Sequence, residues 1–243
     1  MNDGASTDGI AGRIEVVRRQ IISACRRAGR DPADVTLIAV SKTFSWEVVS
    51  EAYAAGIRDF GENYMQDALG KIEQSTACKD IRWHFIGHLQ RNKVRYWNPG
   101  FTLFHCLDSL ALAKELQKKA AREDMTISTL VQVKLGDEPT KSGLVPEAVE
   151  AFIRQLADLS RLRLEGLMTI PPYMIDPEES RCYYRQLRDL RERIAAGGSV
   201  DPRVFRHLSM GMSHDYPVAV EEGATYVRVG TAIFGSRQPQ PQQ

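Results

Sequence analysis

The feature that most constrains the fold is a regular alternation of short apolar segments and amphipathic segments along most of the 243 residues. Each apolar segment is rich in β-branched or aromatic residues, and each is followed by a stretch with helical spacing. The expected strands are residues 36–42, 59–63, 83–88, 103–109, 128–135, 163–170, 205–211 and 226–234. Strands that alternate with helices pair in parallel, because a parallel neighbour needs a crossover connection. Eight such units predict a single-domain α/β fold, the closed (β/α)8 TIM barrel, with an open doubly wound sheet as the alternative.

The segments outside the eight units are short. Residues 10–28 have apolar positions at helical spacing and predict an extra N-terminal helix. Residues 1–8 are small and polar, so we expect them to be disordered, and residues 237–243 to form a flexible tail. The barrel domain is therefore expected to span residues 9–236.

The first expected strand ends on a lysine. Thr36 to Val40 is an apolar run typical of a strand buried on both faces, and Lys42 follows it. A lysine in that place can simply extend its ammonium group into water while its stem is buried. In a barrel, however, the carboxyl ends of all strands meet at the mouth where active sites lie. The strand ends that meet Lys42 there are Asn63, Met168, Ser209, Gly211, Arg228 and Gly230.

Two segments at this mouth are suited to phosphate. Residues 209–213, Ser-Met-Gly-Met-Ser, follow the seventh strand, and Gly230-Thr231-Ala232 lies at the eighth. Glycines allow backbone N–H groups to approach an anion, and hydroxyl groups add further donors. Either segment alone is equally well explained by an ordinary turn or helix cap. Their presence together, where barrels of this kind bind phosphate, favours a phosphate site.

A phosphate site that faces a lysine suggests a phosphorylated cofactor that carries an aldehyde. Pyridoxal 5′-phosphate (PLP) fits, held as a Schiff base by Lys42 and anchored through its phosphate. Arg228 would reach toward the cofactor ring, and its positive charge would favour the neutral amine that a Schiff base requires. The alternative role for Arg228 is a structural ion pair with a neighbouring carboxylate.

Seven motifs carry a resemblance to a known family. They are AVSKT at 39–43, FGENYMQD at 60–67, WHFIGHLQRNK at 83–93, KSG at 141–143, EGLMTIPP at 165–172, LSMGMSHDY at 208–216 and VRVGTAIFG at 227–235. In this order, over nearly the whole chain, they resemble the pyridoxal phosphate homeostasis protein family, whose fold is similar to the N-terminal barrel of alanine racemase. Phe44, where Lys-Pro is common, and Arg91, in place of a frequent serine, are small departures beside the site.

The resemblance implies a set of cofactor-binding residues. Lys42 would be the Schiff-base lysine, and Arg228 would lie against the pyridine nitrogen. Asn63 and Met168 would line the ring, and Ser209, Gly211, Gly230 and Thr231 would surround the phosphate. The family's implied role is to keep vitamin B6, amino-acid and keto-acid pools balanced.

A carrier or buffer of PLP, without catalysis of its own, is the function that we expect. An arginine beside the pyridine nitrogen opposes protonation of that nitrogen, so the cofactor withdraws electrons poorly. Only nine residues follow Phe234, so we expect the second domain of alanine racemase to be absent. The competing hypothesis is a racemase-like PLP enzyme that uses His207, Tyr173 or Tyr64 as a second base. A third is a barrel for another phosphorylated metabolite.

Composition limits the partners. Thirty-two Lys and Arg residues against 31 Asp and Glu residues give a net charge of +1, which would attract neither nucleic acid nor an anionic membrane. No signal peptide or spanning segment is expected, and four cysteines without a CxxC pair predict reduced thiols in the cytoplasm. We expect a monomer whose partners are PLP and apo-enzymes that accept it. His84 and His88 are expected to face the helix layer or the strand end, and to hold no metal.

Overall fold

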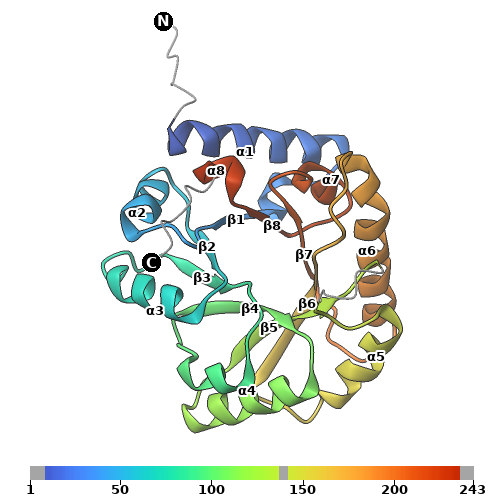
Figure 1. The fold of residues 1–243 in the computed structure, drawn as a ribbon. Helices are drawn as coiled ribbons and strands as arrows, with labels where there is room; N and C mark the ends of the chain where they lie inside the picture. Colours follow the sequence, from blue (N-terminus) through green and yellow to red (C-terminus); the bar gives the residue numbers. More distant parts are fainter. Residues whose placement is uncertain (1–8, 137–141, 236–243) are drawn as a thin grey trace, which may run out of the picture.

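The alternation of strands and helices closes into a barrel. The computed structural model describes residues 9–136 and 142–235. The terminus 1–8 and the tail 237–243, expected from the sequence to be disordered and flexible, lie outside these ranges. The eight strands pair in parallel in the order β1-β2-β3-β4-β5-β6-β7-β8, and β8 returns to pair with β1 (Figure 1). The predicted (β/α)8 barrel is confirmed, and the open sheet is excluded.

The strands lie close to their expected positions. Their bounds are β1 Thr36–Val40, β2 Asp59–Glu62, β3 Arg82–Phe85, β4 Phe101–Leu107, β5 Ile127–Val133, β6 Leu162–Thr169, β7 His207–Met212 and β8 Tyr226–Val229. Residues 226–234, expected as one strand, are divided between β8 and the short helix α8 (Thr231–Phe234). Gly230 separates the two with φ −113° and ψ −76°, which lies outside the extended region. The apolar run after the glycine therefore turns into a helix, and its Ile233 and Phe234 are buried.

Helices surround the barrel (Figure 1). The α-helices are α1 Ile10–Arg27, α2 Trp46–Ala54, α3 Met65–Gln74, α4 Leu110–Arg122, α5 Pro146–Gln155, α6 Arg181–Ala196 and α7 Tyr216–Glu221. Three 3-10 helices are η1 Pro32–Asp34, η2 Arg91–Tyr96 and η3 Pro177–Ser180. The segment after β3 forms the 3-10 helix η2. None of the helices in the described part of the chain is long and apolar enough to cross a membrane.

The extra helix α1 completes the outer layer. Its buried positions Ile10, Ile14, Val17 and Ile21 recur at helical spacing, as the sequence predicts. This face packs against α7 and against α8, which is a short helix of four residues (Figure 1). Arg13 stabilises the contact between α1 and α8, because its Nε donates to the carbonyl oxygen of Ile233 at 2.6 Å. Helix α1 therefore supports the end of the chain that carries Gly230 and Thr231.

Candidate functional site

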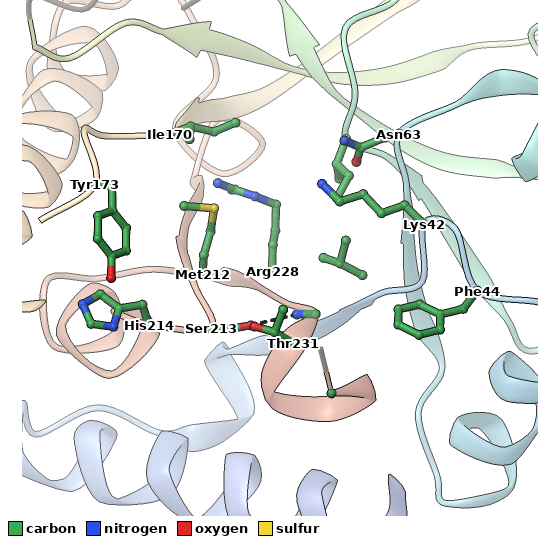
Figure 2. A pocket seen from close by; sticks show the side chains of 14 residues that line it. Lys42, Phe44, Asn63, Ile170, Tyr173, Met212, Ser213, His214, Arg228 and Thr231 are labelled. Atoms are coloured by element: carbon green, nitrogen blue, oxygen red, sulfur yellow. Dashed lines mark hydrogen bonds between the residues drawn. The ribbon is translucent and has the colours of Figure 1, made fainter. Parts of the chain in front are cut away.

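A cavity of about 290 Å³ lies at the carboxyl ends of the strands. Its volume is just below the usual range for small-molecule sites, roughly 300–1,000 Å³. Five of the eight residues predicted from the sequence line it: Lys42, Asn63, Arg228, Gly230 and Thr231. Figure 2 shows the side chains of Lys42 and Arg228 extending into the same space, with Ser213 and Thr231 along one side.

The other three predicted residues lie outside the cavity lining. Met168 and Ser209 are both fully buried, at 0% exposure, and Ser209 contacts Arg228 from below the cavity. Ile170 lines the cavity in place of Met168. Residues two apart on a strand share a face, so Met168 lies one layer deeper on the same face. Strand β7 likewise continues to Met212, and Ser213 supplies the hydroxyl group at the mouth.

Gly211 has a steric reason to be glycine. Its φ of +88° is unfavourable for other residues, and a Cβ atom there would lie 2.5 Å from the Cβ of Ala219. Strand β7 and helix α7 therefore touch through this glycine. The positive φ and the close contact with Ala219 explain why residue 211 is a glycine. Its role toward a phosphate stays a prediction.

Replacing Gly211 by alanine should lower the free energy of unfolding by about 2–6 kcal/mol, because the strain and the overlap each cost roughly 1–3 kcal/mol. Chemical denaturation would measure the loss. Gly70 is the matched control, since it lies in α3 with no atom within 4 Å of an added Cβ. Gly70→Ala should stabilise the protein by up to about 1 kcal/mol. Equal stability of the two variants would show that the contact at Gly211 relaxes freely.

A tight turn presents Lys42 to the cavity. Thr43, the next residue, has φ +70°, and the backbone N–H of Phe44 donates to the carbonyl oxygen of Ser41 at 3.1 Å. A threonine in the left-handed region is uncommon and costs energy, so the surrounding structure must hold it there. The aromatic ring of Phe44 then lines the cavity and lies 4.9 Å from the ring of Phe234.

A buried ion pair joins the two strand ends that carry Lys42 and Asn63. Lys71 of α3 donates to Glu62 Oε1 at 2.7 Å and to the carbonyl oxygen of Ser41 at 2.8 Å. The hydroxyl group of Ser41 donates to the same Oε1 at 2.6 Å. Burial raises the pKa of Glu62, while the Lys71 charge and hydrogen bonds act against that rise. Because Ser41 and Glu62 directly precede Lys42 and Asn63, this network fixes both strand ends relative to each other.

Asn63 holds an unused acceptor. Its Oδ1 is buried and accepts no hydrogen bond from any residue in the described ranges. The segment after β3 lies close to its backbone, since a Cβ atom on Gly87 would lie 2.2 Å from the Asn63 carbonyl oxygen. Asn63 thus lines the cavity with a buried oxygen that the described residues leave without a hydrogen bond.

Arg228 is buried at 4% exposure and forms the floor of the cavity. One terminal nitrogen donates to Ser209 Oγ at 2.6 Å and the other to the carbonyl oxygen of Thr169 at 2.8 Å. Burial lowers the pKa of the guanidinium. Neither hydrogen-bond partner is a carboxylate, so the structural ion pair considered for Arg228 is not the arrangement found. Part of its charge remains available to a molecule in the cavity.

Ser213 connects the seventh and eighth strand ends. Its Oγ accepts from the backbone N–H groups of Gly230 at 3.0 Å and Ala232 at 3.3 Å. The hydroxyl proton of Ser213 is then left to donate to another acceptor. Sequence analysis placed Ser213 in the correct loop but chose Ser209 and Gly211 as binding residues. The signal that identifies Ser213 is that it follows the last residue of β7.

The remaining predictions concern histidines and second bases. His84 lies inside the barrel, where it contacts Asp59 and His105, so the expectation that it faces the helix layer was wrong. The cause is that β3 places Trp83 and Phe85 among the buried apolar residues of the outer core. Of the three candidate bases, Tyr173 lines the cavity, whereas His207 begins β7 at the opposite end.

Comparison with known proteins identifies the family. Residues 17–238 match the alanine racemase N-terminal domain family. The pyridoxal phosphate homeostasis protein of Aquifex aeolicus is 43% identical over 226 residues, which cover 93% of this chain and 97% of that protein. The chain belongs to the pyridoxal phosphate homeostasis protein family. Another member, from Pseudomonas aeruginosa, is 42% identical over 94% of this chain and 96% of that protein.

A solved structure is similar to this member of the homeostasis protein family. PipY of Synechococcus elongatus, solved with PLP bound, is 37% identical and superposes with a TM-score of 0.81 over 93% of this chain and 100% of that one. The family resemblance inferred from the seven motifs is therefore confirmed, as is the barrel of the alanine racemase N-terminal type.

Proposed function

We propose that this protein binds PLP at the cavity and acts as a carrier or buffer of the cofactor in vitamin B6 and amino- and keto-acid homeostasis, without catalysis of its own. The observation that carries the proposal is that a lysine and a buried arginine line one cavity of suitable size together with two hydroxyl groups. PLP, when bound, supplies an aldehyde that a lysine amine can capture, a ring nitrogen and a phosphate dianion.

The residues present fit that group. Lys42 would capture the aldehyde, and Arg228 would face the ring nitrogen as a hydrogen-bond donor. The unpartnered Oδ1 of Asn63 offers an acceptor at the ring. Ser213, Gly230 and Thr231 line the part of the cavity that would hold the phosphate. Met168, Ser209 and Gly211 support these residues from outside the cavity lining.

The phosphate site can be tested by comparing PLP with pyridoxal, which lacks the phosphate. Equilibrium dialysis should show that PLP binds at least about tenfold more tightly, because charge-assisted hydrogen bonds contribute roughly 1.5–3 kcal/mol each. Ser213→Ala should weaken PLP binding and leave pyridoxal binding unchanged. The half-buried Ser50 of α2, whose hydroxyl group donates to the carbonyl oxygen of Glu47, is the control. Equal affinities of the parent for PLP and pyridoxal would refute a phosphate site.

A racemase-like enzyme is the competing function, and the place of Tyr173 at the cavity is the observation that favours it. Tyr173 is 72% exposed, and its ring lies 5.2 Å from the ring of His214. Solvent-deuterium exchange at the α-carbon of small amino acids, with the protein fully loaded with PLP, distinguishes the two functions. A carrier should show no exchange above that of free PLP, whereas rapid exchange that Tyr173→Phe abolishes would establish an enzyme.

The proposal extends to partners and location. The proposed oligomeric state is a monomer. Tyr173 and Ile175 expose apolar surface beside the mouth, which suits contact with an apo-enzyme that accepts the cofactor. All four cysteines are free thiols, which suits the cytoplasm. The net charge of +1 argues against a nucleic-acid partner.

A further inference from the structure

A line of buried polar side chains crosses the inside of the barrel below the cavity. Arg228 donates to Ser209 Oγ at 2.6 Å, and Ser209 Oγ lies 2.8 Å from His105 Nδ1. His105 Nε2 lies 3.0 Å from His84 Nδ1, and His84 Nε2 lies 3.0 Å from Asp59 Oδ1. All five residues are at most 5% exposed. Ser209 of β7 and His105 of β4 come from strands that are not neighbours, so the line passes through the barrel interior.

The far end of the line reaches the opposite mouth of the barrel. Asp59 is the first residue of β2, and it accepts from Arg82 Nε at 2.8 Å and from Arg82 Nη2. The side chain of Arg82 is 53% exposed. The buried carboxylate of Asp59 is therefore neutralised by an arginine that reaches solvent, while the other end of the line supports Arg228 at the cavity.

The chemistry of the two ends determines the direction of every hydrogen bond between them. A guanidinium only donates and a carboxylate only accepts, while a neutral imidazole has one donor and one acceptor. The hydroxyl group of Ser209 must then donate to His105 Nδ1, His105 Nε2–H to His84 Nδ1, and His84 Nε2–H to Asp59. In this arrangement every proton in the line has an acceptor. Both histidines are neutral and carry their proton on Nε2.

The reverse direction leaves a proton without a partner. If His84 were doubly protonated, it would donate to His105 Nε2, and His105 would donate from Nδ1 to Ser209. Ser209 Oγ would then accept from both His105 and Arg228, and its own proton would have no acceptor among its recorded contacts. A buried unsatisfied donor costs roughly 1–3 kcal/mol. Burial and the neighbouring His84 and Arg228 also lower the pKa of His105, which keeps that ring neutral.

We propose that His84 and His105 are positioning residues for Arg228, acting through Ser209 in a directed hydrogen-bond relay that begins at Asp59. In this relay the hydroxyl group of Ser209 donates its hydrogen bond to His105, so a lone pair of Ser209 points toward Arg228. The carbonyl oxygen of Thr169 holds the other nitrogen. This inference rests on the proposed function only in that Arg228 serves the ring nitrogen of PLP. The relay itself belongs to the cofactor-free protein.

The first test measures the relay without cofactor. Two-bond ¹⁵N–¹H correlation spectra of the cofactor-free protein at pH 7, with labelled histidine, report which ring nitrogen carries the proton. The variants His88→Gln, His207→Gln and His214→Gln assign three of the five histidines, and the two remaining sets of signals belong to His84 and His105. We expect His84 and His105 both to be protonated on Nε2 alone. A proton on Nδ1 of His105, or a doubly protonated His84, would overturn the relay whether or not the protein binds PLP.

The second test measures the effect on Arg228. His84→Phe keeps a ring but removes both nitrogens, and it should weaken PLP binding about tenfold although His84 does not line the cavity. His207→Phe, at a half-buried histidine outside the relay, should change the affinity by less than about threefold. In an Arg228→Gln background, His84→Phe should have no further effect, because residues that act through one another are not additive. Independent effects of the two changes would overturn the proposal.

Discussion

Replacing Lys71 by methionine should lower the free energy of unfolding by about 3–5 kcal/mol, because it leaves the carboxylate of Glu62 buried without its counter-charge. The Glu62 side chain is 0% exposed, and its Oε2 already has no hydrogen-bond partner in the described part of the chain. The loss should be smaller at pH 5 than at pH 8, since burial raises the pKa of Glu62 and a protonated carboxyl group carries no charge to bury. Equilibrium denaturation at the two pH values measures both effects.

Two variants make this prediction specific. Lys118→Met removes an exposed lysine that pairs with Glu115, and it should cost less than about 1 kcal/mol. The double variant Glu62→Gln with Lys71→Met removes both charges and should recover much of the loss. If Lys71→Met cost no more than Lys118→Met, the buried pair would not be what holds the ends of β1 and β2 together.

On acidification from pH 7 to pH 5, His105 and His207 together should lower the free energy of unfolding by up to about 3 kcal/mol, before the opposing effect of buried carboxyl groups is counted. Burial lowers the pKa of His105 well below 6.5 and that of His207 to about 4. Between about pH 6.5 and these lower values the unfolded chain holds protons that the folded protein does not. Stability is therefore present above pH 6.5 and decreases as the pH falls, by up to about 1.4 kcal/mol per pH unit for each histidine. The partly exposed His207 should contribute less than His105.

Buried carboxyl groups oppose this trend. Burial raises the pKa of Glu62 and of Asp108, so the folded protein takes up these protons first and gains stability as the pH falls. Denaturation at half-unit pH steps would measure the net slope. His207→Gln should flatten part of the curve between pH 7 and pH 5. A curve that this variant leaves unchanged would contradict the lowered pKa of His207.

The fold could be predicted from the sequence because it depends on a repeated pattern. The period of the apolar residues and the spacing of the eight units together allow few arrangements. The repeated pattern did not predict the local backbone geometry at single residues. Gly230 ends β8 four residues after it begins, and the apolar residues that follow it suit a strand as well as a buried helix.

Depth within the barrel was the harder part of the site. A strand's pattern shows which residues share a face but not which of them reaches the mouth. Met168 and Ser209 lie below the cavity, which Ile170 and Ser213 line. Lys42, Asn63, Arg228, Gly230 and Thr231 line the cavity, while the role of each residue toward a cofactor stays a prediction. The polar relay inside the barrel could not be predicted, since its contacts join strands that are distant in the sequence.

The central claim is that Lys42 is the amine that captures PLP, and the most direct test is the visible absorption spectrum of the protein with PLP added. The parent should show a Schiff-base band, and borohydride reduction followed by peptide mapping should place a pyridoxyl group on Lys42. Lys42→Ala should lack the band, whereas Lys118→Ala, at an exposed lysine, should retain it. A band that persists in Lys42→Ala, or a parent that shows no band at saturating PLP, would contradict the account.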